Sequence, residues 1–164
     1  MKKFVIPLFL IVFFAGTSCE NKIDIEKEKE AIMAVILKEG DAHAAHDLKG
    51  LYAVHIQDSL VTRLQTRKNN YSIYAGWDEI KSLFESWTKM DMTKYENIKN
   101  SKENVILKVL DDCAWLICDS NWEYVKEGNP IRESDIQITF LEKIEGEWKI
   151  SFNAIVIKSG PERE

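Results

Sequence analysis

The chain has 164 residues, of which 45% are apolar and 30% are charged, and its net charge at pH 7 is −5. That apolar fraction is typical of a globular domain and excludes a chain that is disordered throughout. The acidic balance argues against sequence-independent binding to nucleic acid, because such binding needs clustered lysine and arginine. At this length we expect one domain with a substantial hydrophobic core.

The first residues have the layout of a secretion signal. Two lysines precede an apolar run over residues 4–15, which is shorter than the roughly 20 residues that a membrane-spanning helix needs. Small residues then lead directly into Cys19, an order that resembles a bacterial lipoprotein signal, in which the cysteine is lipidated and becomes the new N-terminus. We therefore predict a signal peptide over residues 1–18 and a lipid-anchored protein of the bacterial cell envelope, periplasmic or at the outer membrane. An ordinary secretory signal cleaved near Ser18 is the alternative.

The remainder divides into a short tether, one domain and a tail. We expect the lipidated cysteine and tether over residues 19–25, the domain over residues 26–158 and a C-terminal tail over residues 159–164. The membrane would be contacted through the lipid anchor only.

Helical periodicity predicts three helices in the first half of the domain. Apolar residues recur at offsets of three and four from Ile25 to about His46, and Asp24 is placed to cap this helix. A short second helix is expected from an Asp47 cap to His55. A third follows Gly76 and ends near Met90, after a hairpin whose strands cover residues 60–65 and 71–74.

After Thr93 the apolar period changes to two, which predicts a run of antiparallel strands. Strands are expected over residues 95–99, 105–110, 113–125, 131–143 and 148–158, with turns at Glu127-Gly128-Asn129-Pro130 and at Glu145-Gly146-Glu147. Helices followed by strands indicate an α+β domain. Strands of about thirteen residues usually bend, because sheet twist accumulates along them, so the sheet should curl over the helices and enclose a pocket.

Two cysteines remain besides Cys19. Cys113 and Cys118 lie five residues apart on one predicted strand, which sends them to opposite faces at a Cα separation of about 16 Å. A disulfide needs less than about 7 Å. We expect two small, buried, apolar side chains.

Several segments together resemble the nuclear transport factor 2-like superfamily, specifically its SnoaL-like branch. The resemblance covers essentially the whole domain, and the segments that carry it are residues 40–47, Leu51-Tyr52, Gly76-Trp77-Asp78-Glu79-Ile80 and residues 141–150, which end in Gly146-Glu147-Trp148-Lys149-Ile150. It implies three N-terminal helices packed on a strongly curved antiparallel sheet, a cone-shaped α+β barrel, and a homodimer formed through the sheet. Trp148 and Ile150 would fill the core. Many related sequences carry a histidine shortly after Trp-Lys-Ile, where this chain has Ser151-Phe152-Asn153-Ala154-Ile155.

The superfamily includes isomerases, dehydratases and polyketide cyclases as well as binding and dimerisation domains, so the fold alone does not give the function. On this resemblance we place His55 and Tyr52 near the mouth of the cone, with His55 as a proton carrier and Tyr52 as an oxyanion donor if the protein is an enzyme. We expect His43 and His46 to be polar residues at a helix end, exposed or capping.

Other candidate contacts lie on the strands. Trp122 and Tyr124 share one face of a strand and Trp115 takes the other, so either face could line the pocket. Arg63 is expected to pair across strands with Glu123, Glu133 or Asp135, or else to hold a ligand carboxylate.

No HExxH motif, phosphate-binding glycine loop, dinucleotide fingerprint or Ser-His-Asp order is present, so we predict no metal and no cofactor. The leading hypothesis is a binding protein for a small, largely apolar molecule, contacted by Tyr52, His55, Arg63, Trp122 and Asn153. The alternatives are an acid–base enzyme of the isomerase, dehydratase or cyclase type, and a dimerisation or docking module whose cone is filled by side chains.

Overall fold

The computed structural model describes residues 24–67 and 69–158, so the predicted signal peptide, Cys19 and the C-terminal tail lie outside the described residues. Three helices and six strands make up the domain. They are α1 (Ile25–Ala44), α2 (Leu48–Val54), β1 (Thr62–Arg67), β2 (Asn70–Ala75), α3 (Trp77–Thr88), β3 (Tyr95–Val109), β4 (Cys113–Lys126), β5 (Asn129–Ile144) and β6 (Glu147–Ile157). Among the described residues, no helix combines the length and the apolar character needed to cross a membrane.

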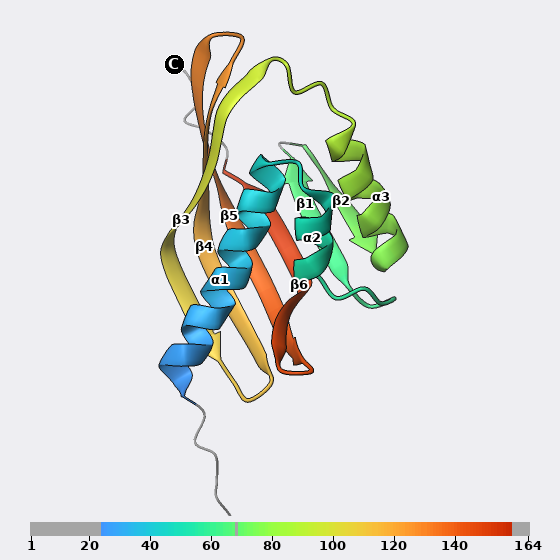
Figure 1. Cartoon of the computed structure of the whole chain (residues 1–164), viewed down its shortest axis with the longest axis vertical. Helices are drawn as coiled ribbons and strands as arrows, with labels where there is room; N and C mark the ends of the chain where they lie inside the picture. The colour runs from blue at the N-terminus through green and yellow to red at the C-terminus, as the bar shows by residue number, and fades with distance from the viewer. Residues whose placement is uncertain (1–23, 68, 159–164) are drawn as a thin grey trace, which may run out of the picture.

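The six strands form one curved sheet in the order β2-β1-β6-β5-β4-β3, and the helices cover its concave face (Figure 1). This confirms the predicted α+β architecture with three N-terminal helices, although the sheet stays open rather than closing into a barrel. Four of the five strand pairs are antiparallel, and β1 runs parallel to β6. The sequence pattern did not predict the parallel pair, because alternation within a strand carries no information on the direction of its neighbour.

Strand β3 is one continuous strand where the sequence predicted two. Its register with β4 shifts between Glu96 and Lys99 and again between Glu103 and Ile106. Asn97 and Asn104 have φ values of 54° and 50° at these shifts, a conformation that asparagine adopts more readily than most residues. Such bulges bend a strand, and they also interrupt the apolar alternation, which explains the gap in the prediction.

The two long hairpins turn through the predicted glycine-containing segments. Glu127 and Gly128 have φ values of 50° and 80°, and Glu145 and Gly146 have values of 51° and 86°. Two consecutive residues with positive φ are the mark of a type I′ turn, whose twist matches that of the flanking strands. The turns therefore fix the register of β4, β5 and β6.

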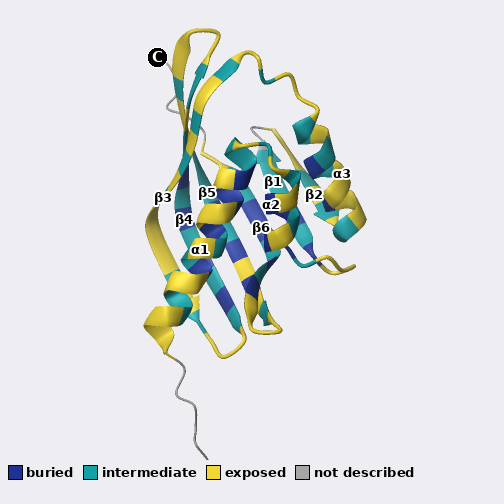
Figure 2. Ribbon diagram, in the orientation of Figure 1, coloured by how far each residue is buried: buried dark blue, intermediate teal, exposed yellow. Residues whose placement is uncertain are grey.

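Helix α1 lies across the concave face and buries one stripe (Figure 2). Ile32 and Ile36 are fully buried against β4, β5 and β6, where they join Trp148 and Ile150 in the main core as the sequence predicted. Near its N-terminus Glu28 accepts hydrogen bonds from the Trp148 indole and the Lys143 ammonium, both at 2.6 Å. These contacts fix the orientation of α1 and therefore of the side chains on its last turns.

The helix caps are formed in part as expected. Asp24 accepts a hydrogen bond of 3.2 Å from the backbone N–H of Lys27, as an N-cap should. Asp47 occupies the N-cap position of α2 but its side chain makes no capping hydrogen bond, contrary to the prediction.

Both described cysteines are free thiols on β4. Cys118 is buried in the main core, as expected, whereas Cys113 is only half-buried at the start of the strand. Burial raises the pKa of the Cys118 thiol, so this side chain is a packing group rather than a nucleophile.

Candidate functional site

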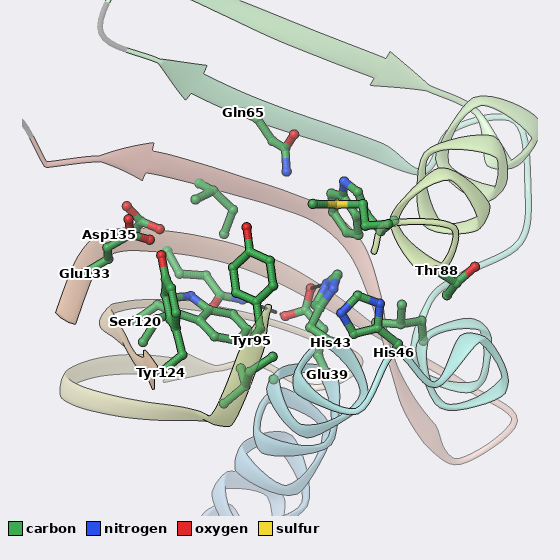
Figure 3. Close-up of a pocket in the computed structure, with 18 of the residues that line it drawn as sticks. Glu39, His43, His46, Gln65, Thr88, Tyr95, Ser120, Tyr124, Glu133 and Asp135 are labelled. Atoms are coloured by element: carbon green, nitrogen blue, oxygen red, sulfur yellow. Dashed lines mark hydrogen bonds and ion pairs between the residues drawn. The ribbon is translucent and has the colours of Figure 1, made fainter. Parts of the chain in front are cut away.

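A cavity of about 420 Å³ lies between the C-terminal part of α1, α3 and the concave face of the sheet (Figure 3). Apolar atoms make up most of its wall surface, and many of its polar side chains come from α1 and from the strands. The lining residues are Glu39, Gly40, His43, His46, Leu51, Arg63, Gln65, Trp87, Thr88, Met90, Met92, Tyr95, Ile98, Lys102, Ser120, Trp122, Tyr124, Glu133, Asp135, Gln137 and Ile155.

The carboxylate of Glu39 forms the centre of the polar floor. One oxygen accepts hydrogen bonds from Arg63 at 3.1 Å and from Asn153 at 2.6 Å, and the other accepts one from Gln137 at 2.8 Å. Burial by itself would raise the pKa of Glu39, but the contact with His43 and the charge of Arg63 hold it well below its usual range. Glu39 is therefore a fixed anion with its hydrogen-bonding capacity in use, and not a proton acceptor.

The register of the sheet explains how three strands meet this carboxylate. Arg63 on β1 is the partner of Asn153 on β6, which in turn is the partner of Thr139 on β5. All three residues lie in one row across the concave face, and Gln137 is the next inward residue along β5. A helix residue above this row can contact three strands at once.

Glycine at position 40 allows α1 to approach the sheet closely enough for that contact. A Cβ atom at this position would collide with the Oδ1 of Asn100 on β3. The Asn100 side chain is held by its own hydrogen bonds to Ser120 and to the backbone carbonyl of Asn121, both at 3.1 Å. The missing side chain of Gly40 therefore determines how deep Glu39 sits.

His43 lies one helical turn after Glu39, with its Nε2 3.6 Å from a Glu39 oxygen. The ring packs on Trp87 at 4.7 Å and on Phe84 at 5.7 Å between centroids, and its side chain is only 14% exposed. Burial lowers the pKa of His43, so the ring is neutral at pH 7. The expectation of an exposed or capping residue was wrong for His43, because α3 covers the end of α1.

His46 also lines the cavity rather than capping a helix. Its backbone has a φ of 54°, in the turn between α1 and α2, and its Nδ1 is buried without a hydrogen-bond partner among the described residues.

His55, the predicted proton carrier, is buried beneath the floor and is not among the lining residues. Its Nδ1–H donates to the carbonyl of Leu51 at 2.8 Å, and its Nε2 lies 3.8 Å from Glu39. Burial lowers the pKa of His55 to about 4, which keeps the ring neutral. His55 therefore contacts the Glu39 carboxylate from the side away from the cavity.

Tyr52 likewise lies outside the lining. Its hydroxyl donates to Glu85 on α3 at 3.3 Å, and its ring packs edge-on against Trp77 at 5.1 Å. Burial raises the pKa of Tyr52. In this structure Tyr52 joins α2 to α3.

The structure places the other three predicted contacts at or behind the cavity. Trp122 lines it together with Tyr124, and Trp115 is on the opposite face of β4, so the alternation correctly separated these aromatic residues. Asn153 holds Glu39 from behind and does not line the cavity.

Arg63 lines the cavity but pairs with Glu39 on α1 instead of with a strand acid, which corrects the predicted partner. Its guanidinium also lies 5.1 Å from the centre of the Trp87 ring. The exposed cross-strand pair belongs to Arg132, which contacts Glu123 at 3.1 Å.

The polar residues of the site that were missed as candidates include Glu39, Lys102 and Gln137. A signal was available for Glu39, because it falls on the same buried stripe as Ile32 and Ile36. A buried glutamate needs a cationic partner. The sequence does not reveal which cation supplies it, since Arg63 is 24 residues away on a different element.

Among residues 24–67 and 69–158, no group of three or more His, Cys, Asp or Glu side chains is arranged to hold a metal ion.

Comparison with known proteins identifies solved structures that share this fold. No protein-family model and no curated protein sequence matches the chain. Solved structures do match. An NTF2-like protein with a cystatin-like fold from Novosphingobium aromaticivorans has a TM-score of 0.68 at 13% identity, covering 84% of this chain and 86% of that one. An NTF2-like superfamily protein from Salmonella enterica has a TM-score of 0.67 at 14% identity, covering 85% and 99%.

A third match is a candidate scytalone dehydratase from Novosphingobium aromaticivorans, with a TM-score of 0.65 at 13% identity and coverage of 82% and 87%. At such identities the likeness concerns the fold and not the activity. The described domain therefore has the fold of the nuclear transport factor 2-like superfamily, as the sequence resemblance implied.

Proposed function

We propose that this protein binds a small, largely apolar molecule in the cavity beneath α1 and α3. The observation that carries the proposal is a cavity of about 420 Å³ whose wall includes Trp87, Met90, Met92, Tyr95 and Trp122 above a compact polar floor. Ligand sites typically have this volume and this combination of an apolar wall with a few placed polar groups. An open cavity also favours ligand binding over a docking module with a filled cone.

The test is to purify the protein from its native envelope and identify co-purifying small molecules by mass spectrometry. A matched preparation carries Trp122→Asp, which places a charge in the apolar wall. The proposal predicts a bound molecule in the first preparation and its loss from the second. The same yield of the same molecules from both preparations would contradict it.

A second candidate function is an acid–base enzyme of the isomerase, dehydratase or cyclase type. The specific observation in its favour is the contact between His43 and Glu39 at the cavity floor, since a neutral histidine oriented by a fixed carboxylate is suited to accept a proton. In this arrangement His43 would take the role that the sequence assigned to His55. One solved structure with the same fold is a candidate scytalone dehydratase, which fits this reaction class.

One experiment on the co-purifying molecule distinguishes the two proposed functions. For an enzyme, His43→Gln should abolish turnover and leave binding within a few fold, whereas His55→Gln should act mainly on stability. For a binding protein, neither variant nor the unaltered protein converts the molecule.

We further propose that the protein is a lipid-anchored member of the SnoaL-like branch in the bacterial envelope, held through Cys19. The support is the order of the first nineteen residues: two lysines, a short apolar run and small residues before the cysteine. Expression with an alkyne-labelled fatty acid should label the protein in the membrane fraction. Cys19→Ala should remove the label and release the protein, whereas Cys113→Ala should change neither.

We also propose that the protein forms a homodimer through the outer face of the sheet. Phe140 is 47% exposed there and packs against Phe152, and Ile106 on β3 is 60% exposed. Exposed apolar side chains on one sheet face often mark a protein interface.

A further inference from the structure

The floor of the cavity holds two side-chain cations close to a single carboxylate. Lys102 on β3 donates to Gln137 at 2.6 Å and to Ser120 at 2.9 Å, and both of these partners are neutral. Within the described ranges it has no carboxylate at ion-pair distance, taken as 4.0 Å. Lys102 is half-buried at the cavity wall, so its ammonium is available to an anionic ligand group in the cavity.

Arg63 provides the second cation and is only 5% exposed. One of its terminal N–H groups bonds to Glu39, but its Nε is buried with no hydrogen-bond partner among the described residues. A buried donor without an acceptor is unfavourable. Arg63 also lines the cavity, so the charge of its guanidinium attracts an anionic ligand group.

The single carboxylate on the floor does not neutralise both cations. Glu39 is shared by Arg63, Asn153 and Gln137. The neighbouring rings of His43 and His55 add no charge at pH 7, because burial lowers the pKa of each. The floor therefore carries a surplus positive charge.

The other charged lining residues lie toward the opposite end of the cavity. Figure 3 shows Glu133 and Asp135 on β5, beside Tyr124 and away from His43. Lys102 shares a row with Ser120 and Asp135, but its ammonium reaches Gln137, one inward position deeper along β5. Asp135 acts on Lys102 through its charge, but among the described residues it forms no ion pair with the ammonium.

We propose that the ligand carries an anionic oxygen group, of the carboxylate type, which binds at Lys102 and Arg63 while its apolar body packs against Trp87, Trp122 and Tyr95. This inference rests on the proposed function of the cavity and adds the chemical class of the ligand. Charge-assisted hydrogen bonds from an ammonium and a guanidinium are the strongest that protein side chains offer to such a group.

The test compares three probes with the same apolar body, namely 2-naphthoate, 2-naphthamide and 2-naphthylmethylammonium. Each is titrated calorimetrically into the protein at pH 7. The expected Kd for naphthoate is at least about tenfold lower than that for naphthamide, because a hydrogen bond to a charged group outweighs a neutral one. The ammonium probe should bind most weakly.

Substitutions on β3 test whether Lys102 causes the preference for naphthoate over naphthamide. Lys102→Met should reduce the naphthamide-to-naphthoate Kd ratio several-fold, because Arg63 alone then remains to attract the anionic group. It should leave naphthamide binding within about twofold, which also shows that the pocket is intact. Lys102→Arg should retain the preference. Lys108→Met, an exposed position on the same strand, is the matched control and should behave like the unaltered protein.

The proposal is overturned if the unaltered protein binds naphthoate and naphthamide equally, or if it prefers the ammonium probe, which would mean that Glu133 and Asp135 govern recognition. It is also overturned if Lys102→Met keeps the preference undiminished. If none of the three probes binds, the ligand-binding function itself fails together with the ligand class. Binding of naphthamide without a preference for naphthoate refutes the ligand class alone.

Discussion

A Glu39 oxygen and the Nδ2 of Asn153 lie 2.6 Å apart, joining the first helix to the last strand across the interior of the domain. Asn153 is 1% exposed and Glu39 is 2% exposed, so both groups must find their hydrogen bonds within the protein. The same carboxylate also neutralises Arg63. The site and the tertiary fold are therefore stabilised by the same contacts.

Replacing Glu39 should destabilise the whole domain. Glu39→Gln retains the shape of the side chain but leaves the buried Arg63 guanidinium without its counter-charge, which typically costs about 3–5 kcal/mol. Urea unfolding followed by circular dichroism measures the loss. Glu26→Gln is the control on the same helix: its exposed pair with Lys29 should leave the unfolding midpoint unchanged.

Stability should fall as the pH is lowered from neutral. In the folded state the pKa of His55 is about 4, below its usual 6.5. Between these values the unfolded chain therefore binds a proton that the folded chain does not, so the stabilisation is complete above pH 6.5 and is lost toward pH 4. His55 alone accounts for a loss of about 3 kcal/mol over this range.

The pKa of His43 is also lowered in the folded state, so His43 likewise reduces the free energy of unfolding as the pH falls. The pKa of Glu39 lies well below its unfolded value of 4.5, so Glu39 causes a further loss of stability below pH 4.5. Urea unfolding at pH 7 and at pH 4.5 measures how far the free energy of unfolding falls between these two values. His55→Gln should reduce the difference between the two pH values. An unchanged difference in that variant would mean that His55 is not buried in its neutral form.

Adding a methyl group at position 40 should disturb the contact between α1 and β3. Gly40→Ala would force the Asn100 side chain from its hydrogen bonds with Ser120 and Asn121, and overpacking of this kind typically costs about 1–3 kcal/mol. The double variant Gly40→Ala with Asn100→Ala should recover part of the stability, because the obstructing side chain is absent. If the single variant unfolds at the same urea concentration as the parent protein, α1 does not need the glycine.

A charge on the outer sheet face should break the proposed dimer. Phe140→Glu places a carboxylate beside Phe152 in the proposed interface, so light scattering coupled to size exclusion should change from a dimer to a monomer mass. Tyr71→Glu, at an exposed position on the edge strand β2, should leave the dimer intact. A monomer mass for the unaltered protein would refute the interface.

The sequence predicted the elements of this fold better than it predicted the site. Alternation within a strand is a local property, and it correctly assigned Trp122 and Tyr124 to one face and Trp115 to the other. The partner of Arg63 depends on how α1 crosses the sheet, which no local pattern encodes, so the sequence did not identify Glu39 as that partner. His43 was expected to be exposed or capping for the same reason, because the rings that cover it belong to α3.

The direction of α1 has a practical consequence for attaching the protein to a surface. Fourteen residues separate Ile25 from Glu39, which at the rise of an α-helix is about 21 Å along its axis. The cavity is lined by residues at the C-terminal end of α1 and therefore lies far from the helix end at which the domain begins. An affinity tag or sensor chip coupled ahead of Asp24 would leave the proposed binding site free to exchange ligand with the surrounding solution.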